Sequence, residues 1–487
     1  MIVKKWIVYL FFSVTGFLVG VFAIYVYWLH GGPSLQHWHT ELLPAEFNIA
    51  KKDFIKTFDD YIKLEEKLFR QLNEEIYAGS ETGPGFELSR YSPRSIADPR
   101  YRKPDWNRSF ELETKSPIGG VLLLHGMSDS PYSLRALGQA LSRRGYWVIG
   151  LRLPGHGTVP SALTIVTWEE MAVVVRLGID RLVSRVGENA IHLVGFSTGA
   201  PLALNYALDV LDARSTTPLA SLVLISPAIG ISPLAALAMW QSRLAKLPGL
   251  NRLAWTQVLP EFDPYKYNSF TANAGAQVHR LTRSVAERIE SRAVAPIREF
   301  PPTLAFLSVV DATVSTEAVI DNLFDHLAPG QHELVLFDIN RRSIKSVLVN
   351  SDPEPLTRRL MENGNLPFHL NLITNESSQS RSLISRYKAP LEASVSTRRL
   401  NLAWPSGVVS LSHVALPFPP DDPIYGGPES SADNIIQLGL IDLKGERGLL
   451  EIPSDWLLRL RYNPFYDFLE NRVIQWMDDI ENKSGGG

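Results

Sequence analysis

Continuous apolar runs alternate with helix-like segments through the middle of the chain, and this alternation most constrains the fold. The runs are GGVLLLHG at 119–126, YWVIGL at 146–151, IHLVG at 191–195, LASLVLIS at 219–226, TLAFLSVV at 303–310 and ELVLF at 333–337. Strands that are apolar on both faces are typical of a parallel sheet with helices on each side. The sequence therefore predicts an α/β fold with a mostly parallel sheet.

Two long segments interrupt the alternation. Residues 232–300 are rich in Ala, Leu and Trp and contain several prolines, whereas residues 340–405 carry scattered Asn, Ser and Arg. We expect both to be insertions, and the second to loop away from the core and return. Earlier in the chain, residues 53–76 repeat apolar side chains at helical spacing, which predicts an amphipathic helix that docks onto the following domain.

The composition narrows the possible partners and cofactors. The 487 residues carry a formal net charge of −3 and no long basic run, so nucleic acid is not an expected partner. The chain contains no cysteine, which excludes disulfides, thiolate metal sites and a cysteine nucleophile. The histidines lack metal-ligand spacing, so we predict no metal and no cofactor. A calcium pair at Asp421 and Asp422 stays open as an alternative.

An uncharged run of 24 residues, Trp6 to Leu29, lies near the amino terminus. As a helix it would be about 36 Å long, enough to cross a bilayer core of about 30 Å. The apolar core of a secretory signal has only about 7–15 residues. The run therefore predicts a transmembrane signal anchor at residues 6–29, with a buried core helix as the alternative.

Charges on either side of this run predict its orientation. Lys4 and Lys5 precede it, whereas residues 31–50 contain Glu41 and Glu46 and no Lys or Arg. Since positive residues favour the cytoplasmic side, we expect residues 1–5 in the cytoplasm. The domain after residue 30 would then be extracytoplasmic, and periplasmic in a bacterium.

The stretch GFSTG at 195–199 joins an apolar strand directly to a helical pattern. Ser197 at its centre has two interpretations. It is either a helix cap, as serines commonly are, or a nucleophile on a sharp strand-to-helix turn of the G-x-S-x-G type. Flanking glycines leave room for such a turn, so the sequence favours the nucleophile.

A serine nucleophile needs a base, and the base needs an acid to orient it. In this architecture the acid and then the histidine follow the serine in the chain. Asp311 ends the apolar run TLAFLSVV, where catalytic groups collect, and Asp338 is its rival. His413 lies in a loop just beyond an apolar strand, and His369 is the alternative base.

The negative oxygen that develops during acyl transfer needs two backbone donors. We expect one to be the amide of Thr198, which follows the nucleophile, and the other the amide of Met127 after the run VLLLHG. His125 and His156 are expected to hold their loops by hydrogen bonds rather than to act as bases.

Five motifs carry a family resemblance, in the order VLLLHGMSDS, LRLPGHG, HLVGFSTG, VVDATV and SLSHVALPF. Together they resemble the α/β-hydrolase superfamily, and within it the monoacylglycerol-lipase, lysophospholipase and carboxylesterase-like group. The resemblance covers about residues 105–480. It implies an α/β-hydrolase fold with the triad Ser197, Asp311 and His413, oxyanion donors at Met127 and Thr198, and a helical cap at 232–300.

The expected organisation follows from these observations. After the anchor come a linker with an amphipathic helix at 30–104, the first part of the core at 105–231, the cap, the second part of the core at 301–480 with the insertion 340–405, and a tail at 481–487. The expected function is a membrane-anchored serine hydrolase that cleaves acyl-lipid or small acyl esters. An amidase or peptidase of the same fold and a catalytically silent binding module are the alternatives.

Overall fold

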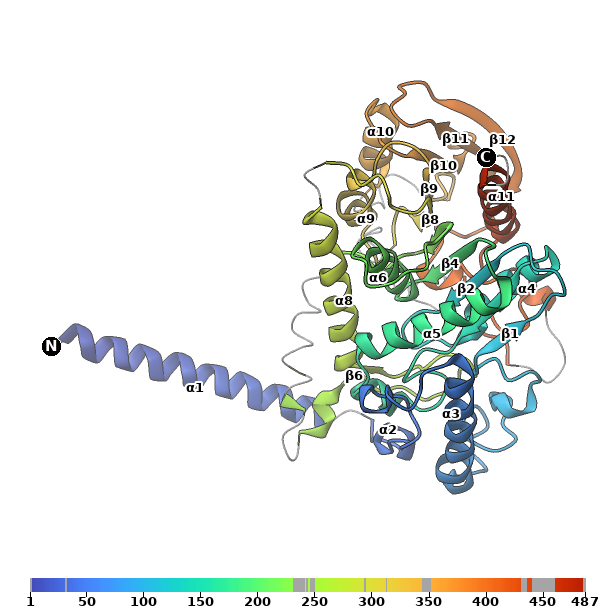
Figure 1. Ribbon diagram of the computed structural model, residues 1–487. Coiled ribbons are helices and arrows are strands. Elements are labelled where there is room, and N and C mark those ends of the chain that lie inside the picture. Colours follow the sequence, from blue (N-terminus) through green and yellow to red (C-terminus); the bar gives the residue numbers. More distant parts are fainter. Residues whose placement is uncertain are drawn as a thin grey trace.

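A ten-stranded sheet forms the centre of the computed structural model (Figure 1). The model describes residues 2–30, 33–230, 241, 244–245, 250–292, 295–311, 313–343, 352–430, 436–439 and 460–484. The sheet strands are β1 (Phe110–Leu112), β2 (Gly120–Leu124), β3 (Trp147–Leu151), β4 (Ile191–Phe196), β5 (Ser221–Ile225), β8 (Thr303–Ser308), β9 (His332–Phe337), β10 (His369–Asn375), β11 (Ser382–Lys388) and β12 (Ser396–Ala403). A separate short pair consists of β6 (Trp255–Gln257) and β7 (Phe270–Thr271).

The strands lie in the order β1-β3-β2-β4-β5-β8-β9-β10-β11-β12. Those from β3 to β10 are parallel, whereas β1, β11 and β12 pair antiparallel with their neighbours. Every residue of β2, β3, β4, β5, β8 and β9 is buried, as the continuous apolar runs require. The prediction of an α/β fold with a mostly parallel sheet is confirmed.

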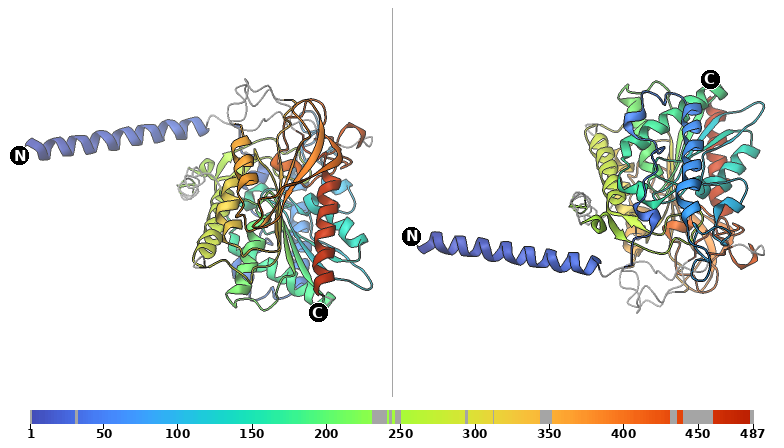
Figure 2. Two further views of the ribbon diagram at one scale, coloured as in Figure 1. Left: turned by 90° about the horizontal axis from the view of Figure 1, so that it is seen from above. Right: turned by 90° about the horizontal axis from the view of Figure 1, so that it is seen from below.

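Helices cover both faces of the sheet (Figure 2). The helices α5 (Trp168–Val186), α6 (Gly199–Leu211) and α8 (Ala272–Glu290) share one apolar cluster with the sheet. On the opposite face α4 (Arg135–Arg143) and α11 (Tyr466–Ser484) share another. The shorter α9 (Thr316–Asn322) and α10 (Glu354–Glu362) lie beside the later strands.

The amino-terminal helix α1 (Ile2–His30) projects away from the rest of the molecule (Figure 1). Its large side chains are exposed along its length, with Trp6 and Phe17 both at 70%. Residues Lys5–Tyr25 are long and apolar enough to cross a membrane. The alternative of a buried core helix is therefore wrong, because none of this span is buried by the rest of the chain.

The segment expected as a linker is folded against the domain. Three apolar side chains of this segment are buried: Trp38, which belongs to the short helix α2 (His37–Thr40), and Leu43 and Phe47, which follow it. The amphipathic helix α3 (Phe58–Gln71) docks as predicted, and its Tyr61 hydroxyl donates a hydrogen bond of 2.8 Å to the carbonyl of Arg152. The interface here is thus built from apolar packing and a buried hydrogen bond.

The two expected insertions differ from expectation. Much of 231–249, the first part of the expected cap, lies outside the described residues. The part at 272–290 is α8, whose Ala274, Val278 and Leu281 join the main apolar cluster beside α6. The insertion 340–405 was expected to loop away, but it supplies β10, β11 and β12 and so widens the sheet.

Candidate active site

Ser197 lies on a sharp turn between β4 and α6. Its φ of +51° is left-handed, a conformation that costs free energy for a residue with a side chain and that clusters at functional sites. Its backbone N–H donates to the carbonyl of Ile225 at 2.9 Å, which fixes the turn to the neighbouring strand. Thr198 occupies the helix N-cap position, where no side chain makes a capping hydrogen bond.

The flanking glycines are required by close backbone approach. A Cβ on Gly199 would lie 2.0 Å from the carbonyl oxygen of Leu124, and one on Gly195 would lie 2.5 Å from the Cα of Ala200. The helix can therefore start directly behind the strand only if both positions lack a side chain.

Asp311 and His413 are hydrogen-bonded although 102 residues separate them. His413 Nδ1 lies 2.9 Å from Asp311 Oδ2, and the two side chains are 6% and 0% exposed. The other carboxylate oxygen accepts the backbone N–H groups of Thr313 and Val314 at 2.8 and 3.0 Å. Burial opposes ionisation of Asp311, but His413 and these hydrogen bonds outweigh it and lower the pKa of Asp311 below its usual value.

His413 lies next to the residue that precedes Ser197. The rings of His413 and Phe196 have centroids 5.5 Å apart, and His413 begins a short turn, His413–Ala415. The preceding Ser412 hydroxyl donates to the carbonyl of Leu460 at 3.0 Å, which anchors this turn. The Asp311 and His413 pair thus lies at the carboxyl end of the parallel strands, where His413 packs against Phe196, the neighbour of Ser197 in the chain.

The rival residues have other partners. Both carboxylate oxygens of Asp338 accept hydrogen bonds from Arg341, and one also accepts the hydroxyl of Thr374 at 2.7 Å. His369 begins β10 and contacts the hydroxyl of Tyr387 at 2.5 Å. Neither residue shares the Asp311 and His413 hydrogen bond.

The loop after β2 lies against Ser197. A Cβ on Gly126 would be 3.0 Å from Ser197 Cβ, so the loop that continues into Met127 passes close to Ser197. His125 fixes the loop as expected, because its Nδ1 bonds the carbonyl of Gly126 at 2.9 Å and its Nε2 accepts the N–H of Leu153 at 3.1 Å. Burial, with the nearby His156, lowers the pKa of His125 well below its usual value.

His156 is held in a similar way. Its Nδ1 lies 2.9 Å from the carbonyl oxygen of Pro154, and burial lowers its pKa to about 4. Because both histidines stay neutral and bond backbone groups, they shape the loops around the site, as the sequence indicated.

Sequence reasoning missed an ion pair beside Ser197. Asp129 is 5% exposed. Its Oδ2 lies 2.7 Å from the position that a Cβ on Gly126 would take, the same position that is 3.0 Å from Ser197 Cβ. Lys266 Nζ lies 3.2 Å from Asp129 Oδ1. Burial raises the pKa of Asp129, and Lys266 opposes that shift. Lys266 lies in the segment FDPYKYNSF at 262–270, where no local motif links it to Asp129.

The segment containing Lys266 is fastened to the same loop. The N–H of Tyr267 donates to the carbonyl of Ser128 at 2.8 Å, and the Tyr267 hydroxyl accepts the N–H of Thr158 at 2.8 Å. Ser128 itself has a left-handed φ of +66°. The loop after β2, the Asp129 and Lys266 ion pair and Ser197 therefore form one connected unit.

Asp422, one of the two aspartates considered for calcium, already has hydrogen-bond partners within the chain. Asp422 accepts hydrogen bonds from the Tyr132 hydroxyl at 2.9 Å and from Arg135 at 2.8 Å, and from two backbone amides. In the part of the chain that the structure describes, no three His, Asp or Glu side chains are grouped so that they could hold a metal ion.

Comparison with known proteins agrees with this architecture. Residues 121–342 match the model of an alpha/beta hydrolase family. A thermostable monoacylglycerol lipase from Bacillus sp. (strain H-257) is 26% identical over 243 residues, which are 50% of this chain and 89% of that protein.

The solved structures that match about half of this chain include those of two lipolytic enzymes. A metagenome-derived lipolytic enzyme is 19% identical with a TM-score of 0.38, covering 47% of this chain and 87% of its own. The monoacylglycerol lipase of Paleococcus ferrophilus is 22% identical with a TM-score of 0.36, covering 47% of this chain and 88% of its own. The sheet topology and the family match place this chain in the α/β-hydrolase superfamily, where it is similar to lipases and esterases.

Proposed function

We propose that this protein is a membrane-anchored serine hydrolase that cleaves carboxylic esters through an acyl-enzyme. Ser197 Oγ attacks the ester carbonyl while His413 accepts its proton, and Asp311 holds the imidazole in the required tautomer. The amides of Met127 and Thr198 bind the negative oxygen of the tetrahedral intermediate. His413 then gives the proton to the leaving alcohol, and water repeats the sequence to release the acid.

One observation carries this proposal. The hydrogen bond of 2.9 Å between Asp311 and His413 joins two distant parts of the chain beside Ser197, which has a left-handed φ of +51°. A buried carboxylate that bonds Nδ1 of a histidine next to such a serine has the geometry of an orienting acid and a base. A purely structural helix start would need none of these features.

The proposed substrate is an acyl lipid such as a monoacylglycerol or a lysophospholipid. Two observations support this choice: the similarity to a monoacylglycerol lipase and the exposed apolar helix α1, which would keep the domain at a membrane surface. Lys4 and Lys5 lie in the first turns of this helix and precede its uncharged run, which favours an amino terminus in the cytoplasm and an extracytoplasmic domain.

Labelling with a fluorophosphonate tests the activated serine. The full-length protein in detergent is reacted with the probe, and the covalent adduct is measured by intact mass. We expect Ser197→Ala to abolish labelling and His413→Ala to slow it at least about 100-fold, because the base is lost. His369→Ala is the matched control and should label like the wild type.

The outcome separates the alternatives. A folded wild type that takes up no label would overturn the proposal in favour of a silent binding module. If the protein labels, paired ester and anilide substrates with the same acyl group distinguish an esterase from an amidase. Hydrolysis of the anilide alone would contradict the ester assignment.

A further inference from the structure

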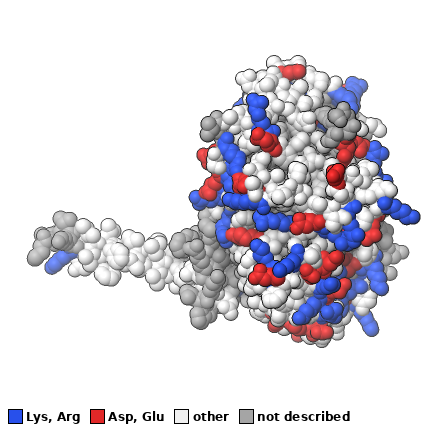
Figure 3. Space-filling view, in the orientation of Figure 1, with Lys and Arg blue, Asp and Glu red and all other residues white. Residues whose placement is uncertain are grey.

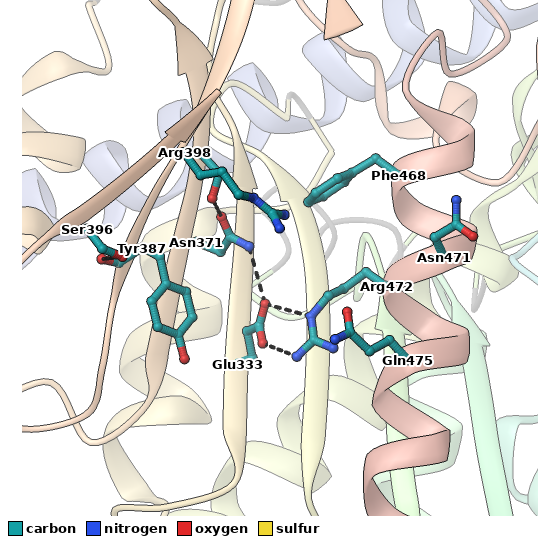
Figure 4. A pocket seen from close by; sticks show the side chains of 10 residues that line it. Glu333, Asn371, Tyr387, Ser396, Arg398, Phe468, Asn471, Arg472 and Gln475 are labelled. Atoms are coloured by element: carbon teal, nitrogen blue, oxygen red, sulfur yellow. Dashed lines mark hydrogen bonds and ion pairs between the residues drawn. The ribbon is translucent and has the colours of Figure 1, made fainter. Parts of the chain in front are cut away.

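A polar cavity of about 440 Å³ lies between the added strands and the carboxyl-terminal helix (Figure 4). Its lining comes from β9, β10, β11 and β12 on one side and from α11 on the other. Glu333 is the second residue of β9, whereas Asp311 lies beyond the opposite end of the neighbouring strand. At about 3.3 Å per residue, Glu333 lies about 13 Å back along the sheet from that end. The cavity is thus separate from the site of Ser197.

Polar residues occupy a sheet face that is apolar elsewhere. Further along the same face, Val335, Phe337 and Ile373 pack in the cluster that α11 covers. Near the other end of these strands the face changes to Glu333 and Asn371, which are only 2% and 7% exposed. Because buried polar groups cost free energy unless they are bonded, this change requires partners or a ligand.

A network of hydrogen bonds fixes one guanidinium at the cavity. Arg472 on α11 makes a double ion pair with Glu333, with Nε 3.1 Å from Oε1. Asn371 donates to Glu333 at 3.5 Å, and its own oxygen accepts the Ser385 hydroxyl at 2.7 Å. Arg472 also lies 5.5 Å from the ring centre of Trp476. The cationic group is therefore held in place before any ligand arrives.

Several groups around the cavity keep unused hydrogen-bonding capacity. Among the described residues, Arg472 Nη1 is buried without a partner, and no partner is found for the side chains of Arg398, Asn471 and Gln475. Arg398 extends from β12 toward Phe468 on α11 (Figure 4). Two guanidiniums and one carboxylate give the ten lining residues a net charge of +1.

We propose that this cavity binds a small acidic carbohydrate, a sugar ring that carries a carboxylate. The guanidinium of Arg398 presents a planar pair of donors that matches a carboxylate, while Arg472, whose other donors bond Glu333, adds Nη1. Asn471 and Gln475 supply both donors and acceptors, which suits the hydroxyl groups of a sugar. Phe468 offers an apolar surface for the C–H face of the ring. The proposal does not depend on the proposed hydrolase activity.

Binding of D-glucuronate to the full-length protein in detergent tests this proposal, with D-glucose and acetate as partial ligands. Affinities are measured by saturation-transfer NMR. We expect D-glucuronate to bind at least tenfold more tightly than D-glucose or acetate. Added salt should weaken the binding of D-glucuronate. Arg398→Gln should weaken binding at least tenfold and leave fluorophosphonate labelling at Ser197 unchanged.

Arg399→Gln is the matched control. Arg399 is the next residue on the same strand, so its side chain lies on the opposite face, where it pairs with Glu376. This variant should bind D-glucuronate within twofold of the wild type. If D-glucose binds as tightly as D-glucuronate, the site does not recognise the carboxylate, and the acidic part of the proposal is overturned. If acetate binds as tightly as D-glucuronate, the carbohydrate part is overturned. An equal loss in Arg399→Gln would overturn the location.

Discussion

At the scale of single residues, the pair of Asp129 and Lys266 presents an electrostatic problem. Asp129 Oδ2 and Ser197 Cβ lie near the same point beside Gly126, so they are within about 6 Å of each other. A negative charge there opposes the negative oxygen that forms during acyl transfer. At an effective dielectric constant of about 20 the unscreened cost is about 3 kcal/mol, or roughly 100-fold in rate. We infer that Lys266 neutralises this carboxylate.

Lys266→Met should therefore lower kcat for ester hydrolysis by about 10- to 100-fold. The deficit should grow with pH, because burial raises the pKa of Asp129 and the unpaired acid is neutral until the pH exceeds that value. Adding Asp129→Asn should restore most of the loss, and Lys266→Arg should show little loss. If the double variant is no better than Lys266→Met, Lys266 acts on the substrate instead. Rates of ester hydrolysis for the single and double variants, measured across a pH series, decide between these two roles of Lys266.

At the scale of secondary structure elements, the close backbone contact between the end of β2 and the start of α6 affects both the stability of the fold and the position of Ser197. Gly199→Ala places a methyl group 2.0 Å from the carbonyl oxygen of Leu124, so α6 must move away from the sheet. We expect a loss of about 2 kcal/mol or more in the free energy of unfolding, as for other overpacked positions. Urea unfolding measures it. Gly79→Ala meets no atom within 4 Å and is the control; an equal loss there would contradict the role of the close contact.

The same scale shows what the sequence could and could not predict. Six strands of the sheet were predictable because both of their faces are buried, which leaves a continuous apolar run: β2, β3, β4, β5, β8 and β9. Gly195 and Gly199 indicated the turn at Ser197, and the end of β8 indicated Asp311. By contrast, β12 reads STRRLNLA and is mostly exposed, so no periodic pattern marks it as a strand of the main sheet. The pattern of α8 predicts a helix equally well over the site or beside α6.

Long-range contacts set a second limit on sequence reasoning. Asp129 and Lys266 are 137 positions apart, and only the folded chain shows that they pair. Likewise, the polar residues of the cavity lie on four strands and one helix, with no local motif in common. Local patterns identify elements and strand ends, whereas the charges that surround a site depend on which elements become neighbours.

At the scale of the whole molecule, charge is distributed very unevenly. On the face that Figure 3 shows, blue and red side chains are interspersed over much of the folded domain, whereas the described part of α1 is almost free of them. A helix whose apolar side chains are exposed on all sides gains free energy by entering a bilayer, at about 25 cal/mol per Å² of apolar surface. The domain, with both charge signs on its surface, stays in water.

This distribution predicts a stable anchor with a defined orientation. The intact protein should remain in the membrane fraction after alkaline carbonate extraction, and its measured mass should include α1. A carboxyl-terminal reporter that fluoresces only in the cytoplasm should stay dark, because Lys4 and Lys5 favour an amino terminus on the cytoplasmic side. Replacing both lysines by glutamate and adding two lysines after residue 30 should invert the protein and light the reporter. A soluble product cleaved after α1 would instead identify this helix as a signal sequence, and a bright wild-type reporter would contradict the orientation.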